Sequence, residues 1–514
     1  MKTLIVAVAF LFACAEAQPR PAEQPRPAEA PDAGAALPDG GAAAAPEKPK
    51  EPPMLPGEQE ALAQQPPIAP LQPFDAPTPR IEKLKNGLEA WIIERKGDGI
   101  ETVVLLSRNG STNDPQGKPG LASLTAALMD TGAAGKTQTQ MAEAADAVGA
   151  ALSVNATQDA LAVTGSAMAN NLEAMVKLLA DVAQRPNLDA KEWKRVQDQR
   201  KAQLIAQKAE PGVGASRAFA AAIYGDNPLA RPVAGTLESV AAMKLDDVKK
   251  YYAALSPKDS VLVAVGGASA DATLAALTKA FGAWNPKGGK LTPPADVKPP
   301  AERPRVVFVE YPGKPQSVVT VGQPAVPRTS PDYLALEALN NVLGGSFTSR
   351  LNQNLREQHG YSYGAGSGFA FGKGPGAFFA RSSVKTDVTG AALSEMLKEI
   401  DKAVAEPLQQ DELDKARALL SYQLVEAVSH SGSLAGALAQ VWLYGLPQDE
   451  YKTFVARLNA LTPASVQEAA KRTLDPAKMT IAIAGDQGKV FPQLTPLKLP
   501  APQLRDPTGQ PVKQ

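Results

Sequence analysis

The feature that most limits the fold of this 514-residue chain is an internal duplication. In each copy a Pro-containing loop leads into a helical stretch, and Glu192 and Glu412 stand at the same place in the two copies, 220 positions apart (412 − 192). Each copy also closes with an apolar strand that ends on a glycine, and Gly266 and Gly485 lie 219 positions apart (485 − 266). Two independent landmarks at nearly one spacing indicate duplication, so we expect two similar domains.

Both kinds of regular structure are expected in each copy. In the first copy, apolar and β-branched runs predict strands at 90–93 and 102–107 and an extended pair across 152–165. Helical spacing of apolar residues predicts helices at 121–129, 172–182 and 190–207. Asp189 is a candidate N-cap for the last of these helices. The sequence therefore predicts an α+β fold with two homologous domains, each a mixed sheet with helices, of about 200 residues.

The segments outside the two copies are rich in proline. Such segments cannot bury enough apolar surface to offset the entropy lost on ordering, and proline keeps them extended. We therefore expect a signal peptide at 1–17, a disordered Pro/Ala-rich linker at 18–80, an N-terminal domain at 81–284, an interdomain linker at 285–303, a C-terminal domain at 304–490 and a flexible tail at 491–514.

The first residues describe a secretory signal. A positive start is followed by an apolar stretch, residues 3–12, that is too short for a permanent membrane span. Two processing routes remain open, because Leu11 to Cys14 resembles a bacterial lipobox whereas Ala15 to Ala17 suits ordinary signal peptidase. The first route lipidates Cys14 and predicts a periplasm-facing protein of the bacterial cell envelope, anchored to the outer membrane. The second route leaves a soluble periplasmic product.

Charge and cysteine content narrow the possible functions. Lys plus Arg equals Asp plus Glu, 53 each, so the chain has no net charge with which to attract nucleic acid. Cys14 is the only cysteine, which makes an intramolecular disulfide impossible.

One stretch of the first copy resembles a known family of peptidases. The segments 110–115 and 117–122 are similar to those that lead into the zinc helix of insulinase/pitrilysin peptidases. In active members a His-x-x-Glu-His motif follows, in which two histidines on one helical face hold Zn²⁺ and the glutamate activates a water. Here Ser123, Ala126 and Ala127 stand at the corresponding positions, and none of the three can ligate zinc or act as a base.

The loss of the zinc motif does not depend on this alignment. The chain has only two histidines, His359 and His430, so a close histidine pair is impossible. The family's third ligand, a glutamate, would fall on the helix that contains Ala202 and Gln203, and neither of these supplies a carboxylate. The resemblance thus implies a chain that binds no metal or other cofactor itself.

The second copy carries the other half of the resemblance. Segments 343–351 and 355–363 are similar to the family's C-terminal signature, whose Arg and Tyr, seven residues apart, match Arg356 and Tyr363. In the family these two contact the main chain of the substrate, which suits a guanidinium and a phenol that donate to a peptide carbonyl. Spacing alone favours a structural interpretation, in which Arg356 is a surface helix residue and Tyr363 packs in a strand; the whole signature around them favours the peptide contact.

A third match lies at 149–157. In the family this run belongs to an edge strand that receives the substrate as an added strand, which implies that Asn155 and Ala156 contact a peptide through the backbone. An ordinary edge strand is the alternative.

Together the resemblance implies a fold and two candidate functions. The fold is the insulinase/pitrilysin half-chamber. In the first function the chain is the non-zinc subunit of a split metallopeptidase: it supplies Arg356, Tyr363 and half of the chamber, and a zinc-bearing homologue supplies the metal as its heterodimer partner. In the second it is an inactive peptide-binding or scaffold protein of the cell envelope.

Overall fold

The computed structural model describes residues 75–286 and 298–512. The predicted signal peptide, Cys14, almost all of the Pro/Ala-rich linker and most of the interdomain linker lie outside the described residues. Within the described part, no helix combines the length and the apolar character that a membrane span requires.

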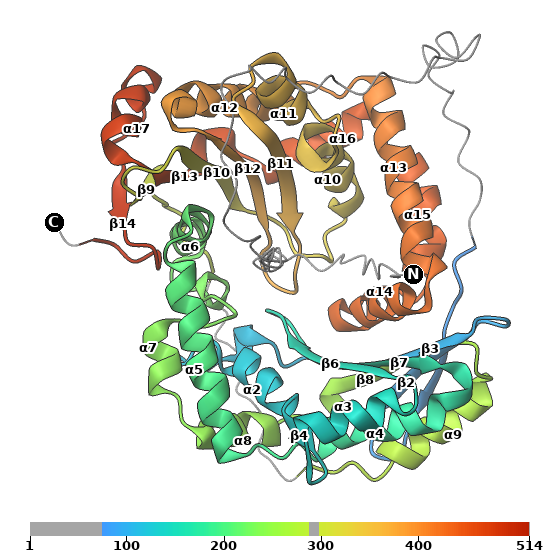
Figure 1. The fold of residues 1–514 in the computed structure, drawn as a ribbon. Helices are drawn as coiled ribbons and strands as arrows, with labels where there is room; N and C mark the ends of the chain where they lie inside the picture. Colours follow the sequence, from blue (N-terminus) through green and yellow to red (C-terminus); the bar gives the residue numbers. More distant parts are fainter. Residues whose placement is uncertain (1–74, 287–297, 513–514) are drawn as a thin grey trace, which may run out of the picture. The chain divides into compact units, whose positions relative to one another are not determined.

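The first half contains a six-stranded mixed sheet in the order β1-β2-β8-β3-β7-β6 (Figure 1). Its strands are β1 (Arg80–Lys83), β2 (Glu89–Glu94), β3 (Ile100–Ser107), β6 (Ala151–Ala156), β7 (Leu161–Met168) and β8 (Ser260–Gly266). Only β2 and β8 run parallel; the other neighbours are antiparallel. A short hairpin is formed by β4 (Gly132–Ala133) and β5 (Lys136–Thr137).

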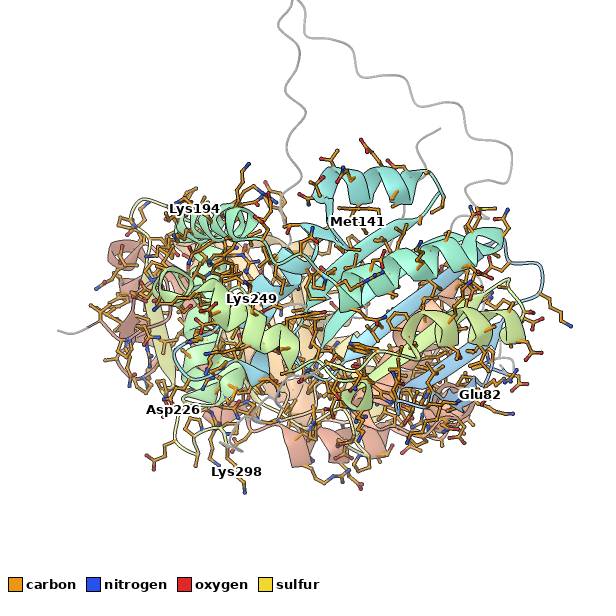
Figure 2. The ribbon with its side chains drawn as sticks, turned by 90° about the horizontal axis from the view of Figure 1, so that it is seen from below. Glu82, Met141, Lys194, Asp226, Lys249 and Lys298 are labelled. Atoms are coloured by element: carbon orange, nitrogen blue, oxygen red, sulfur yellow. The ribbon has the colours of Figure 1, made fainter. Side chains whose placement is uncertain are left out.

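Eight helices belong to the described part of this half. They are α2 (Leu121–Met129), α3 (Gln138–Asp146), α4 (Leu172–Gln184), α5 (Ala190–Gln207), α6 (Pro211–Tyr224), α7 (Leu237–Ala242), α8 (Leu245–Ala253) and α9 (Ala270–Phe281). Viewed from below, α4 and α9 lie side by side and cover one face of the sheet (Figure 2). The N-cap prediction for α5 is confirmed, because Asp189 Oδ1 accepts from the amides of Lys191 (2.7 Å) and Glu192 (3.2 Å).

The second half repeats this plan with the strand order β11-β12-β10-β13-β9-β14. Its strands are β9 (Val306–Glu310), β10 (Gln316–Pro324), β11 (Ser362–Ala370), β12 (Ala377–Lys385), β13 (Thr480–Gly485) and β14 (Gln503–Arg505). Its helices are α10 (Tyr333–Asn340), α11 (Arg350–Asn352), α12 (Thr389–Ala405), α13 (Gln410–Ser429), α14 (Ser431–Tyr444), α15 (Glu450–Asn459), α16 (Pro463–Thr473) and α17 (Gln487–Leu494), with π-helical turns η5 (Asn341–Gly345) and η6 (Gln353–Gln358).

Most elements of one half have a counterpart in the other, as the duplication predicts. In the described residues the hairpin β4–β5 has no counterpart in the second half, and β14 is parallel to β9 whereas β1 is antiparallel to β2. Helices α5 and α6 begin at Ala190 and Pro211, and their counterparts α13 and α14 begin 220 positions later, at Gln410 and Ser431. The α+β class with two mixed sheets is therefore confirmed.

The prediction of a flexible tail at 491–514 is wrong for residues 491–494 and 503–505, which are regular structure. Helix α17 continues to Leu494, and β14 pairs in parallel with β9, with Leu504 opposite Phe308. Strand β14 takes the sheet position that β1 holds in the first half. The physical reason is the edge of β9, whose unpaired backbone groups offer hydrogen bonds to a short segment without a strong strand pattern of its own.

The central strands are buried on both faces. All residues of β8 and β13 are buried. Alternate side chains of a strand point to opposite faces, so such a strand needs a cover on each side. In the first half, Leu262 and Ala264 of β8 join the core beneath α4 and α9, whereas Val261, Val263 and Val265 join a core that contains α14.

The second cover of each sheet comes from the opposite half of the chain. Helix α14 packs on β3 and β8, and α6 packs on β9, β10 and β13. Ala215, Ala218 and Ala222 of α6 share a core with Val307 and Val309. The domain boundaries at 81–284 and 304–490 therefore do not coincide with the packing units, since each half gives one helix to the other.

Charged side chains of the first half bind both ends of α14. At its start, Ser431 Oγ donates to Asp98 Oδ2 (2.5 Å), while the Arg95 guanidinium donates to Val428 O (2.6 Å) in the last turn of α13. At its end, Arg108 Nη2 donates to Trp442 O (2.8 Å). Each charge has the sign that the adjacent helix terminus favours, with the carboxylate at an N-terminus and the guanidinium groups at C-termini.

A buried carboxyl beside this contact gives the fold a pH dependence. Glu101 is 1% exposed and accepts from the Ala268 amide (3.1 Å). Burial raises the pKa of Glu101 to about 7, from an ordinary value of 4.5. At a pH between the ordinary pKa and the raised pKa, Glu101 is protonated in the folded chain and ionised in the unfolded chain. The stability that this group contributes therefore falls as the pH rises from about 5 to about 7.

Replacing this carboxyl should flatten the pH profile. Glu101→Gln keeps an acceptor for Ala268 but cannot ionise. As the pH rises from 5 to 8, the wild type should lose roughly 1–3 kcal/mol of unfolding free energy that the variant keeps. Urea unfolding of both proteins at the two pH values measures this difference. An identical pH dependence of the two proteins would show that Glu101 does not titrate in this range.

Candidate functional site

The loop before α2 is held by a buried carboxylate. Asp114 is 4% exposed, and its side chain accepts from the backbone amides of Gly120 (2.7 Å), Leu121 (3.1 Å) and Ala122 (2.8 Å) at the start of the helix. Gly120 has φ 97°, and a Cβ there would lie 2.7 Å from the Cα of Gly235. Asp114 and Gly120 of the segment 110–122 thus fix the start of α2.

The three residues at which the resemblance places the zinc motif lie on α2, within the helix predicted at 121–129. Ala126 is buried at 2% exposure, and Ser123 and Ala127 are half-buried. Arg200 of α5 donates from Nη1 to Ser123 Oγ (2.9 Å) and to the carbonyl oxygen of Ala234 (3.1 Å). A guanidinium therefore contacts Ser123, where its positive charge would oppose a bound cation.

The third-ligand helix gives no carboxylate to this place either. Ala202 and Gln203 lie on α5 and are exposed. Within residues 75–286 and 298–512, no group of three His, Cys, Asp or Glu side chains is placed to hold a metal ion. The groups at and around Ser123 are a hydroxyl, the methyl groups of two alanines and a guanidinium. Methyl groups have no lone pair and the guanidinium is a cation, so this set does not fit zinc.

The predicted substrate strand is an edge strand. Among the described residues, strand β6 pairs with β7 alone, with Asn155 opposite Ala162 and Ala156 opposite Leu161. It packs beside α2, so this edge and the helix that contains Ser123, Ala126 and Ala127 are neighbours. The Asn155 side chain is exposed and Val154 is buried, as expected for a strand with one face on the core. An unpaired edge of this kind can accept a peptide through main-chain hydrogen bonds.

Arg356 and Tyr363 lie in the second half, on neighbouring elements. Arg356 belongs to the π-helical turn η6, and Tyr363 belongs to β11, the edge strand of the second sheet. Tyr363 does not pack in the sheet, because 88% of it is exposed. The Arg356 side chain is 37% exposed; its Nε lies 3.2 Å from Glu357 Oε1 and its Cζ lies 4.4 Å from the ring centroid of Phe347. Both side chains are thus accessible to a ligand.

The two histidines play no part in this arrangement of donors. His359 stacks on the ring of Tyr361, with centroids 4.9 Å apart, and His430 is the residue between α13 and α14.

Sequence reasoning missed Phe347 and Arg200. Phe347 lies in the segment 343–351 that carries the family signature, so its position was an available signal, but only the structure shows that it is 69% exposed. Arg200 lies one helical turn before Gln203, and only the packing of α5 on α2 reveals its contact with Ser123.

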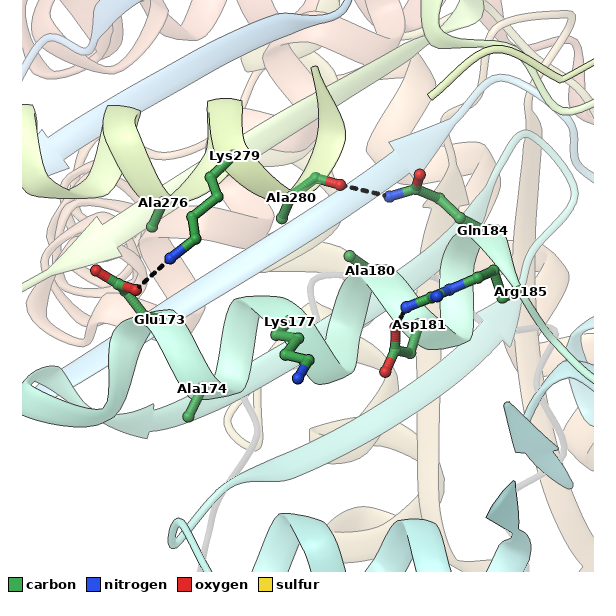
Figure 3. A pocket seen from close by; sticks show the side chains of 10 residues that line it. All are labelled: Glu173, Ala174, Lys177, Ala180, Asp181, Gln184, Arg185, Ala276, Lys279 and Ala280. Atoms are coloured by element: carbon green, nitrogen blue, oxygen red, sulfur yellow. Dashed lines mark hydrogen bonds and ion pairs between the residues drawn. The ribbon is translucent and has the colours of Figure 1, made fainter. Parts of the chain in front are cut away.

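A surface groove lies elsewhere, between α4 and α9. It has a volume of about 680 Å³ and contains none of the predicted site residues. Figure 3 shows that its charged side chains pair within the groove: Lys279 Nζ lies 3.0 Å from Glu173 Oε2, and Arg185 contacts Asp181. Since most of the charge is neutralised locally, the groove offers few groups for a polar ligand.

Comparison with known proteins assigns the family. The family described as Insulinase (Peptidase family M16) matches residues 92–237, and the Peptidase M16 inactive domain matches residues 242–420. In fold, the chain resembles a peptidase M16 inactive domain from Pseudomonas fluorescens, with a TM-score of 0.74 and 26% identity over 79% of this chain and 98% of that one. The periplasmic protease PqqL from Escherichia coli shares the fold alone, with a TM-score of 0.68 and 17% identity over 84% of this chain and 50% of that one.

Curated relatives carry two kinds of name. An uncharacterized zinc protease of Streptomyces coelicolor is 29% identical over 53% of this chain and 60% of its own length. A similar protein of Mycobacterium leprae is covered over 57% of its length, so the chain spans somewhat less than two thirds of these relatives. The non-peptidase homolog YmxG of Helicobacter pylori is 24% identical over 75% of this chain and 89% of its own length. With both of its consecutive domains matched, the chain belongs to the insulinase family of M16 peptidases.

Proposed function

We propose that the chain is the non-zinc subunit of a split M16 metallopeptidase. One observation carries the proposal: the second half presents a half-buried Arg356 and an exposed Tyr363, while Arg200 and three non-ligating residues occupy the region of the first half at which the resemblance places the zinc motif. The peptide-contacting groups are therefore present without the groups that activate water.

The roles of the chain's own groups follow from their chemistry. Arg356 and Tyr363 donate hydrogen bonds to the carbonyl oxygens of a bound peptide, and these bonds strengthen as negative charge develops on a carbonyl oxygen. The edge of β6 near Asn155 and Ala156 binds peptide main chain. A zinc-bearing homologue supplies the metal and the base, and the pair acts in the periplasm, with lipid at Cys14 as its anchor to the outer membrane.

A second candidate is a peptide-binding or scaffold protein without catalysis. The name of the Helicobacter pylori relative, a non-peptidase homolog matched over most of its length, favours it. Such a protein would use the same exposed groups and the same edge strand but would not associate with a zinc subunit.

Purification of the tagged chain from its own host, followed by mass spectrometry, separates these functions. The split peptidase predicts a near-stoichiometric homologue that bears His-x-x-Glu-His. Recovery of the chain alone, or with unrelated envelope proteins, would reject the split peptidase and support the second candidate.

A further inference from the structure

We propose that Asn352 is a positioning residue, which holds Tyr363 and the loop of Phe347 in place to contact a bound peptide. The inference rests on the proposed function, in that peptide contact by Arg356 and Tyr363 is assumed. Asn352 is half-buried and precedes Arg356 by one helical turn.

Tyr363 lies in a β-bulge that Asn352 holds. Along β11 and β12, Ser362 pairs with Val384 and Ala365 pairs with Ser382, so Tyr363 and Gly364 together face the single residue between those two partners. A bulge of this kind leaves residues unpaired and turns a side chain out of the regular alternation. The Ala365 amide, directly after the bulge, donates to Asn352 Oδ1 (2.9 Å).

The amide group of the same side chain holds the neighbouring loop. Asn352 Nδ2 donates to Ser346 O (3.2 Å) and lies 3.4 Å from Ser349 Oγ. Phe347 lies between these two residues, and its exposed ring is the one that Arg356 contacts. One side chain thus joins the loop of Phe347 to the bulge of Tyr363 (Figure 1 shows α11 and β11, the elements concerned).

The backbone around Asn352 is also unusual. Asn352 is the last residue before the π-helical turn that contains Arg356, and a second π-helical turn, η5, ends at Gly345 just before the loop. Such turns are rare in proteins and occur often at functional sites. The π-helical turns and the hydrogen bonds of Asn352 therefore both fix the backbone next to the same three accessible side chains, Phe347, Arg356 and Tyr363.

Peptide binding by the full-length chain tests the inference. Fluorescein-labelled casein peptides serve as the probe, and fluorescence anisotropy gives Kd for the wild type and for Asn352→Ala, Tyr363→Ala, Arg356→Ala and the double variant Asn352→Ala/Tyr363→Ala. Asn354→Ala is the matched control: Asn354 lies two residues further along and bonds Glu395 and Glu399 of α12 instead. Should Asn352→Ala not fold, Asn352→Asp keeps the acceptor for Ala365.

The inference predicts coupling between Asn352 and Tyr363. Asn352→Ala and Tyr363→Ala should each weaken binding about tenfold, and the double variant should weaken it far less than the hundredfold that independent effects would give. Asn352→Asp should lose less affinity than Asn352→Ala, and Asn354→Ala should bind like the wild type.

Two failures are distinguishable. If Arg356→Ala and Tyr363→Ala bind as the wild type does, the proposed peptide contact itself is rejected. If these two variants lose affinity but Asn352→Ala does not, the proposed function survives and the positioning role is rejected. The same conclusion follows if the loss of affinity in the double variant Asn352→Ala/Tyr363→Ala equals the product of the two single losses.

Discussion

Neither half of this chain should fold when it is produced alone. Fragment 75–286 lacks α14, and without it one face of the first sheet is exposed. The side chains affected are Trp91, Ile93, Val104, Leu106, Val261, Val263 and Val265. Burial of one such side chain contributes about 1.5–3 kcal/mol, so this face accounts for as much free energy as the 5–15 kcal/mol by which a whole domain is typically stable.

The same reasoning applies to fragment 298–512, whose sheet loses α6. Each fragment should lack a cooperative thermal transition and should exchange its strand amides rapidly. Co-expression of the two fragments is the control, because it should restore a complex with protected β8 and β13. A fragment 75–286 that unfolds cooperatively by itself, with β8 protected, would contradict the account of exchanged helices.

The second large effect concerns the two exposed donors. In the pair reconstituted with the zinc-bearing homologue, Arg356→Ala together with Tyr363→Phe should lower kcat/KM for peptides about 100- to 1000-fold, the range reported for loss of an oxyanion-stabilising donor. The thermal midpoint should hardly change, because Tyr363 is 88% exposed and its replacement by Phe keeps the ring.

Tyr422→Phe is the matched control for this experiment. Tyr422 is another exposed phenol of the second half, 60% exposed on α13. Its replacement should leave turnover within about twofold of the wild type, as expected for a surface change away from the site. If the complex that carries the Arg356→Ala/Tyr363→Phe double variant turned over peptides as fast as the wild-type complex, the proposed role of both residues would be rejected.

Local sequence signals predicted the regular elements well. Helix α2 spans 121–129 and α5 spans 190–207, as their apolar spacing and the Asp189 cap indicate. The apolar runs before Gly266 and Gly485 are strands, because β-branched residues suit a strand that is covered on both faces. These features depend on neighbours in sequence, which a single chain displays.

The sequence did not show the features that depend on contacts between residues far apart in the chain. An apolar run such as β8 shows that both faces are covered, yet it does not show that α14 is one of the covers. Strand β14 has no strong pattern and forms because the edge of β9 accepts it. The contact of Arg200 with Ser123 likewise depends on how α5 packs on α2, so the sequence did not show the guanidinium beside Ser123.

Peptide turnover measured with and without the zinc-bearing homologue, each in the presence and absence of a chelator, tests the central claim most directly. The account predicts no turnover by this chain alone and chelator-sensitive turnover by the pair that exceeds that of the homologue alone. Chelator-sensitive turnover by this chain alone would contradict the loss of its zinc site, and a homologue whose activity is unchanged by this chain would contradict its role as the second subunit.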